Sequence, residues 1–72
     1  MLTLKRLRLA KRWSRAELAR RARMAAGDVG KIEAGRLQPY ESQLRKLARA
    51  LGVQPNAAPT LLANTEPPDT AA

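Results

Sequence analysis

The sequence contains no cysteine and no histidine, and its only aromatic residues are one tryptophan and one tyrosine. Without cysteine, neither a disulfide nor a thiolate metal site can stabilise the fold. Without histidine, the chain lacks the commonest metal ligand and the commonest general base. No glycine-rich phosphate loop is present either. We therefore predict a protein that is not an enzyme and has no metal, no cofactor and no small-molecule ligand.

A chain of 72 residues has room for one small domain with a limited core. Because aromatic residues are scarce, leucine, alanine, isoleucine and valine must fill the apolar positions, which favours helices over sheets. We predict an all-α domain in residues 1–64. Residues 65–72, TEPPDTAA, are polar and rich in proline, so we predict a disordered tail there.

Positive charge dominates the chain, with 14 Lys and Arg against 6 Asp and Glu and a net charge of +8. Such an excess on a small helical domain is typical of a nucleic-acid binder. An anionic membrane surface is the competing partner, and a solvated basic face is the neutral explanation. Apolar and charged residues alternate in positions 1–9, unlike a signal peptide or a membrane helix. We predict a cytoplasmic protein of bacterial or phage origin that does not enter a membrane.

The stretch from Trp13 to Gly35 has the pattern of helix, tight turn and helix. Ser14 and Glu17 form an S-x-x-E capping box at the start of the first helix, predicted over residues 15–22. Arg23 falls where the turn favours glycine, because the backbone there adopts a positive φ. A second helix is predicted over residues 26–34. Two short helices joined in this way are either a DNA-reading helix-turn-helix or an ordinary helical corner.

Helices are also predicted before and after this stretch. Residues 2–12 place Leu4 and Leu7 on one buried face, with Ala10 or Lys11 one turn further on. Arg8 lies beside that face, and its burial would require a carboxylate partner.

Residues 40–51 carry the clearest helical pattern of apolar positions in the chain. Beyond them, Pro55 can open a short helix. We predict that Pro59 ends this helix within one turn. Leu61 and Leu62 are expected to dock either on the core or on a partner chain.

The motifs of residues 4–53 resemble, in order and without gaps, the phage repressor/Cro family of helix-turn-helix domains. The matching positions are Leu7-Arg8, Ser14, Glu17-Leu18-Ala19, Val29, Ile32-Glu33, Gly35, Pro39, Leu44, Lys46-Leu47-Ala48 and Ala50-Leu51-Gly52-Val53. The resemblance implies a compact bundle of four to five short helices with a central helix-turn-helix. It also implies an ion pair between Arg8 and Glu33, which supplies the partner that a buried Arg8 requires.

The resemblance also assigns the DNA contacts. The third helix would enter the major groove, and its matching base-contact positions are Ala26, Gly27, Asp28 and Lys31. Lys31 can donate to guanine, Asp28 can accept from cytosine, and Ala26 can touch a thymine methyl group. The expected phosphate contacts are Arg15, Arg36, Tyr40, Arg23 and Arg12. Family members usually carry polar side chains where Ala25, Ala26 and Gly27 stand, so direct base reading is expected to be limited.

The favoured function is a sequence-specific, DNA-binding transcriptional regulator, a dimeric repressor or autoregulator of phage, plasmid or mobile-element type. It would bind double-stranded DNA as a homodimer. The alternative is a degenerate helix-turn-helix protein that binds another protein as an anti-activator or adaptor. A basic amphipathic peptide that acts on membranes is a third, weaker interpretation.

Overall fold

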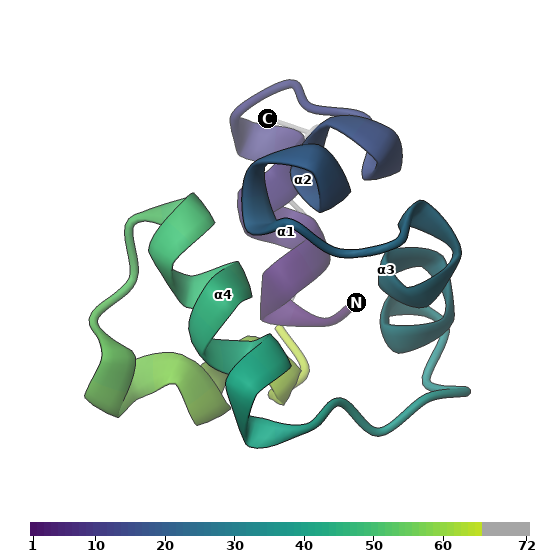
Figure 1. Cartoon of the computed structure of the whole chain (residues 1–72). Coiled ribbons are helices and arrows are strands. Elements are labelled where there is room, and N and C mark those ends of the chain that lie inside the picture. The colour runs from purple at the N-terminus through teal and green to yellow at the C-terminus, as the bar shows by residue number, and fades with distance from the viewer. Residues whose placement is uncertain (66–72) are drawn as a thin grey trace, which may run out of the picture.

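The computed structural model describes residues 1–65 as a bundle of short helices, which confirms the predicted all-α fold (Figure 1). The elements are α1 (Thr3–Ala10), α2 (Arg15–Ala22), α3 (Ala26–Glu33), α4 (Glu41–Leu51) and the 3-10 helix η1 (Pro55–Leu62). None of the helices in the described part of the chain is long and apolar enough to cross a membrane.

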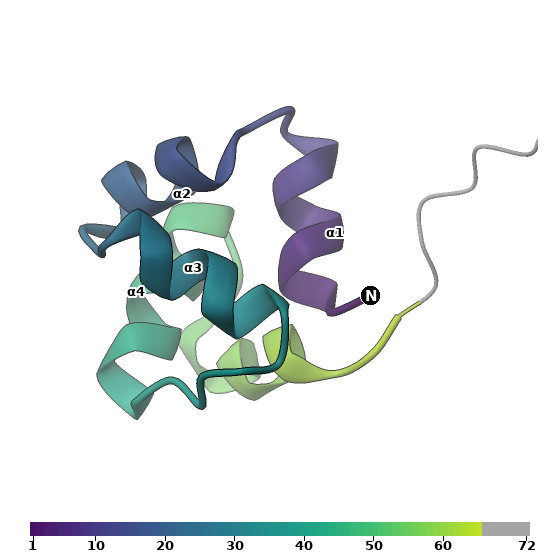
Figure 2. The same cartoon turned by 90° about the vertical axis from the view of Figure 1, so that its right-hand side faces the viewer.

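The helices surround one core rather than forming layers. In Figure 1, α3 lies on the right and α4 on the left, while α1 and α2 lie between them. Figure 2 looks onto the outer side of α3 and shows η1 below α1, behind the lower end of α3. The main packing pairs are α2 with α3 and α4, η1 with α4 and α1, and α1 with α4. Within residues 1–65, the outer side of α3 is uncovered, since Ala26, Gly27 and Lys31 are exposed there.

Every helix contributes side chains to the core. The largest fully buried residues are Leu4, Leu18, Val29, Ile32, Leu47 and Leu61. Each element supplies at least one of them, so the core forms only when all the helices assemble. Burial of one leucine, valine or isoleucine side chain contributes about 1.5–3 kcal/mol.

Local sequence signals explain where α2 and α4 begin and end. Ser14 Oγ accepts a hydrogen bond from Glu17 N at 3.0 Å at the start of α2. After α2, Arg23 adopts the left-handed conformation with φ of 58°, as the turn pattern predicted. Gly52 ends α4 with φ of 78°, which glycine adopts without steric cost. At the start of α4, Gln43 Oε1 accepts from Tyr40 N at 2.8 Å, so a glutamine does the capping.

The first helix is shorter than predicted. It covers Thr3–Ala10 instead of residues 2–12, because Arg12 adopts the left-handed conformation with φ of 60°. The expectation that Ala10 or Lys11 continues the buried face was wrong, since both are exposed. Arg8 is the buried residue one turn after Leu4.

The capping box predicted at the start of α2 is only half formed, and the part assigned to the Glu17 side chain was wrong. Glu17 does not reach back to the helix start, and its carboxylate accepts hydrogen bonds from Arg20 and Arg21. Those two guanidinium groups, three and four residues on along the same helix, offer charged donors in place of a backbone amide.

Pro59 does not end the last helix, contrary to the prediction. The 3-10 helix η1 continues through it to Leu62. Proline fixes φ near −65°, which lies within the 3-10 range, so Pro59 costs only the hydrogen bond that its missing N–H would donate. The continued helix carries Leu61 into the core, where it is fully buried.

The two ends of the described chain are joined. Leu2 and Asn64 form an antiparallel bridge, and Thr65 N donates to Met1 O at 2.7 Å. Thr65 was assigned to the disordered tail, but these backbone hydrogen bonds hold it against the start of the chain. The remainder of that predicted tail, residues 66–72, lies outside the described residues.

Candidate nucleic-acid interface

A buried ion pair fixes the position of α3 relative to α1. Arg8 Nε donates to Glu33 Oε2 at 2.6 Å, and Arg8 Nη2 donates to Glu33 Oε1 at 3.1 Å. Arg8 Nη1 donates to the carbonyl oxygen of Trp13 at 2.7 Å. The side chains of Arg8 and Glu33 are only 7% and 2% exposed. This pair was expected from the sequence resemblance, and its two-pronged geometry satisfies both buried charges.

Arg15 shares the same carboxylate. Its Nε lies 3.3 Å from Glu33 Oε1, and its side chain remains 57% exposed. The stem of Arg15 passes over Gly30, where an added Cβ would lie 3.6 Å from Arg15 Cδ. Arg15 therefore lies across the start of α2 and the end of α3, at the edge of the outer side of α3.

The outer side of α3 carries the four residues predicted to contact bases. Ala26, Gly27 and Lys31 are exposed, and Asp28 is half-buried. Val29 and Ile32 face inward and hold the helix on the core. The helix begins at Ala25 without a side-chain cap. Lys31 is thus the only exposed side chain among the four with a hydrogen-bond donor for a base edge.

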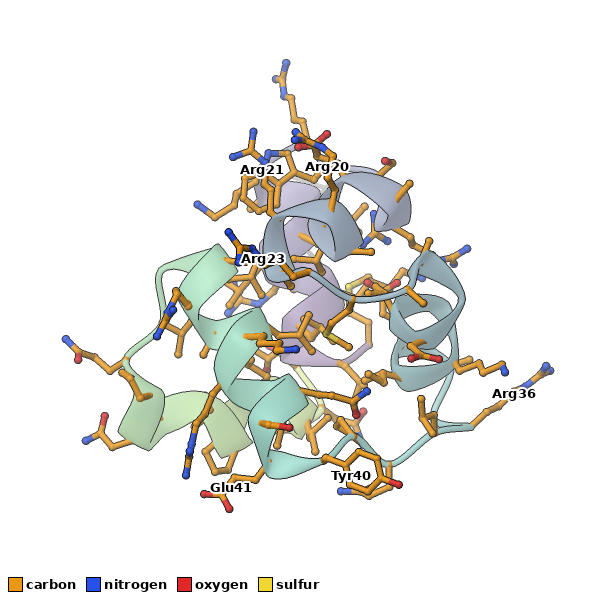
Figure 3. All side chains as sticks on the ribbon, viewed as in Figure 1. Arg20, Arg21, Arg23, Arg36, Tyr40 and Glu41 are labelled. Carbon is orange, nitrogen blue, oxygen red and sulfur yellow. The ribbon has the colours of Figure 1, made fainter. Side chains whose placement is uncertain are left out.

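The loop after α3 supplies two further predicted contacts. Figure 3 shows Arg36 extending outward beyond α3, while Tyr40 lies at the start of α4. Both side chains are exposed, and that of Tyr40 is 77% exposed. Arg12, in the turn before α2, is exposed as well.

The family model for a helix-turn-helix domain matches residues 2–61, well over half of the chain. The chain belongs to the helix-turn-helix domain family. Neither a curated protein nor a solved structure matches it significantly. Helix-turn-helix domains are typically DNA-binding modules rather than catalysts, and α2, the Arg23 turn and α3 are the elements that give the family its name. The narrower assignment to the phage repressor/Cro group stays a prediction.

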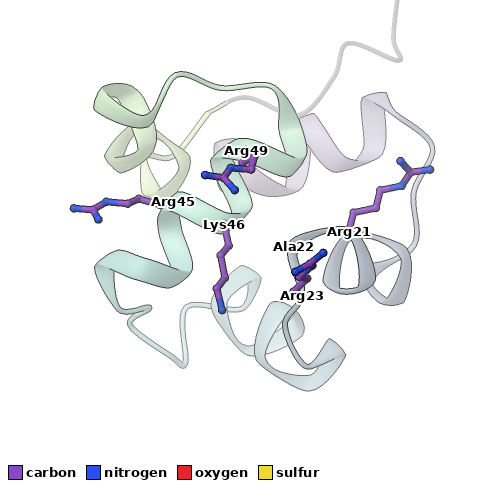
Figure 4. A pocket seen from close by; sticks show the side chains of 6 residues that line it. All are labelled: Arg21, Ala22, Arg23, Arg45, Lys46 and Arg49. Carbon is purple, nitrogen blue, oxygen red and sulfur yellow. The ribbon is translucent and has the colours of Figure 1, made fainter.

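Arg23 does not join the other predicted phosphate contacts of this helix-turn-helix domain. It lines a cleft of about 550 Å³ between α2 and α4, which we call the α2/α4 cleft (Figure 4). The residues that line it are Arg21, Ala22, Arg23, Arg45, Lys46 and Arg49. The cations of α4 lie on the side of that helix opposite its apolar positions. Their spacing identifies one charged face, but only the packing of α2 against α4 brings that face opposite Arg21 and Arg23.

Charge contacts stabilise α2 of the helix-turn-helix domain at its surface. Hydrogen bonds from Arg20, and then from Arg21, hold the pKa of the Glu17 carboxyl below its ordinary value. The guanidinium of Arg21 also lies 4.3 Å from the centre of the Trp13 ring, within the range of a cation–π contact. Arg21 therefore connects α2 to the turn that precedes it.

Proposed function

We propose that this chain is a sequence-specific DNA-binding transcriptional regulator that reads the major groove with α3. The observation that carries the proposal is the free outer side of α3, which presents Lys31 while Arg15 and Arg36 flank it. An exposed helix in a helix-turn-helix domain has the shape that the major groove admits.

Under this proposal, Lys31, Asp28, Ala26 and Gly27 face base edges. The phosphate contacts are Arg15, Arg36 and Tyr40, with Arg12 as a further one. Arg15 would turn from Glu33 toward a phosphate, which is feasible because its side chain is more than half exposed. Since α3 offers few donors, we propose that DNA shape contributes to specificity.

We propose that the regulator acts as a homodimer and represses its own gene or a neighbouring gene of a phage, plasmid or mobile element. A two-fold dimer would place its two α3 helices in half-sites about one helical turn apart.

The test is a fluorescence-anisotropy titration with DNA from upstream of the protein's own gene and a shuffled duplex of equal length, at two salt concentrations. Preference for the upstream duplex of about 10³-fold or more is typical of specific binding. Equal and steeply salt-dependent binding to both duplexes would show that charge alone drives association, which would contradict the proposal.

Two variants locate the interface in the same titration. Lys31→Ala should lower discrimination at one base pair by about 1–3 kcal/mol. Lys5→Ala is the matched control, because it removes the same side chain from α1. If Lys31→Ala weakens binding to the specific and the shuffled duplex equally, as Lys5→Ala does, Lys31 does not read a base.

A second candidate function is binding to another protein with a degenerate helix-turn-helix. It is favoured by the small, donor-poor side chains of Ala26 and Gly27 on the exposed side of α3. This function predicts weak DNA binding without sequence preference, together with capture of a protein partner in a pull-down.

A further inference from the structure

A dense cluster of positive charge lies away from the predicted reading helix, in the α2/α4 cleft. Five of its six lining residues are cationic. Arg21 pairs with Glu17, and Arg45 pairs with Glu41. Arg23, Lys46 and Arg49 form no ion pair with any residue in positions 1–65. Within residues 1–65, three positive charges of the cleft therefore have no ion-pair partner.

Helix stability explains only some of these positions. Arg21 and Arg49 lie in the last turns of α2 and α4, where cations interact favourably with the helix dipole. Lys46 is in the middle of α4, where that effect is absent. Arg23 has a left-handed backbone, a conformation that is strained for a residue other than glycine. In the described part of the chain, Lys46 therefore has neither an ion-pair partner nor a helix-dipole role, and Arg23 keeps a cationic side chain at a position whose backbone favours glycine.

The cleft and the outer side of α3 face different directions. Figure 3 shows Arg21 and Arg23 on the α4 side of α2, whereas Arg36 extends beyond α3 on the other side. The molecule measures 36 × 24 × 23 Å along its principal axes. A straight duplex on the outer side of α3 is therefore not expected to reach the cleft.

We propose that the α2/α4 cleft binds the phosphodiester backbone of a second DNA segment, so that one domain holds two segments. The choice of DNA as the ligand rests on the proposed function. Guanidinium groups and a lysine around an open cleft match phosphate chemistry, and backbone binding needs charge without base contacts.

The lining of the cleft favours DNA over an acidic protein. Among the described residues, Ala22 is the only apolar one in the lining, and none of the lining side chains is aromatic. Protein partners usually bind through buried aromatic or other large anchors surrounded by polar residues. A phosphate backbone needs no such anchor, because counterion release supplies most of its binding free energy.

The experiment tests capture of a second duplex. One duplex is fixed to beads, the full chain is added, and retention of a fluorescent duplex of unrelated sequence is measured. The cleft variant carries Arg23→Gly, Lys46→Gln and Arg49→Gln. Glycine suits the backbone at position 23, so this variant should fold, and its thermal unfolding is recorded as a check. The control variant carries Lys5→Gln, Lys11→Gln and Arg20→Gln, which remove equal charge outside both surfaces.

We expect the cleft variant to retain about tenfold less of the second duplex than the wild type, with its affinity for a single duplex little changed. The control variant should retain nearly the wild-type amount. Four results would overturn the inference: no capture by the wild type, equal capture by the cleft variant, equal loss in the control variant, or polyglutamate binding to the cleft in preference to DNA.

A fifth result separates one DNA segment from two. If the cleft contacts the same duplex as α3, the salt slope for a single duplex falls by about three in the cleft variant, and the inference fails. Sequence preference is measured separately, by comparing the upstream duplex with the shuffled duplex as the fixed DNA. If the wild type shows no such preference but still captures the second duplex, the proposed regulator is refuted and the second DNA site stands.

Discussion

At the scale of single residues, Glu33 holds the helix-turn-helix in place. Its carboxylate binds Arg8 through two hydrogen bonds and also contacts Arg15, while being almost completely buried. Because α1 and α3 each carry one partner, this contact sets the position of α3 on the core. Removing one partner leaves the other charge buried and uncompensated. This loss of folding free energy is larger than the net stabilisation that the intact pair provides.

We expect Glu33→Ala to lower the free energy of unfolding by about 3–5 kcal/mol, since it leaves the Arg8 guanidinium buried without a carboxylate. Urea denaturation followed by circular dichroism measures the loss. The double variant Arg8→Leu/Glu33→Leu should lose less, because it removes both charges. A loss from Glu33→Ala below about 0.5 kcal/mol, typical of a surface substitution, would contradict this role.

Glu17 gives the domain an acid-dependent contribution to stability. Its folded-state pKa is lowered by hydrogen bonds from Arg20 and Arg21. A lowered folded pKa stabilises the folded state above the unfolded pKa, and this stabilisation disappears as the pH falls through the folded value. We expect the melting-temperature difference between wild type and Glu17→Gln to shrink below the ordinary carboxyl range, in thermal unfolding from about pH 7 to about pH 2. A constant difference would exclude the effect.

At the scale of secondary structure, α3 is the weakest helix and also the one proposed to read DNA. It has no side-chain N-cap and contains two glycines in eight residues. Val29 and Ile32, which pack on the core, hold it in place. The helix that the function exposes is therefore stabilised by tertiary contacts rather than by its own propensity.

We expect Gly30→Ala to raise the free energy of unfolding by about 0.8–1 kcal/mol, because alanine favours the helix. The added Cβ would meet Arg15 Cδ at 3.6 Å, an ordinary van der Waals distance. Thermal unfolding should show a melting temperature about 4–8 °C higher per kcal/mol. Gly52→Ala is the matched control and should destabilise, because its φ of 78° suits glycine. A lower melting temperature for Gly30→Ala would show that the close approach of Arg15 matters more than helix propensity.

At the scale of the whole molecule, η1 closes the core and connects both ends of the described chain. It packs on α1 and α4, and the residues after it pair with the first residues. A small domain without disulfides depends on every such contact, because few core residues are available.

We expect Leu61→Ala to lower the free energy of unfolding by about 2–5 kcal/mol, since this side chain is fully buried in the core. Leu9→Ala removes the same atoms at a position that is 40% exposed, and it should cost much less. Urea denaturation compares the two variants. Equal costs would mean that η1 is not part of the cooperative unit.

The amino-acid sequence was sufficient to predict the helical class, the bounds of α2, the bounds of α3 to within one residue at its end, and the left-handed turn at Arg23. These features follow from local periodicity, capping residues and the backbone limits of the turn. The early end of α1 at Arg12 and the continuation of η1 through Pro59 were not predictable in this way. Local signals tolerate either outcome at each of these positions. At Pro59, the gain from packing Leu61 into the core favours the continued helix.

The sequence by itself determined the excess of positive charge, the absence of histidine and cysteine chemistry, and the pattern that identifies a helix-turn-helix. Tertiary structure alone decided where the charges gather. Arg23 lies in the turn next to the proposed reading helix along the chain, yet it faces Lys46 and Arg49 across the α2/α4 cleft. The physical reason is that such a cleft forms between helices distant in sequence, and their relative position depends on how the core packs.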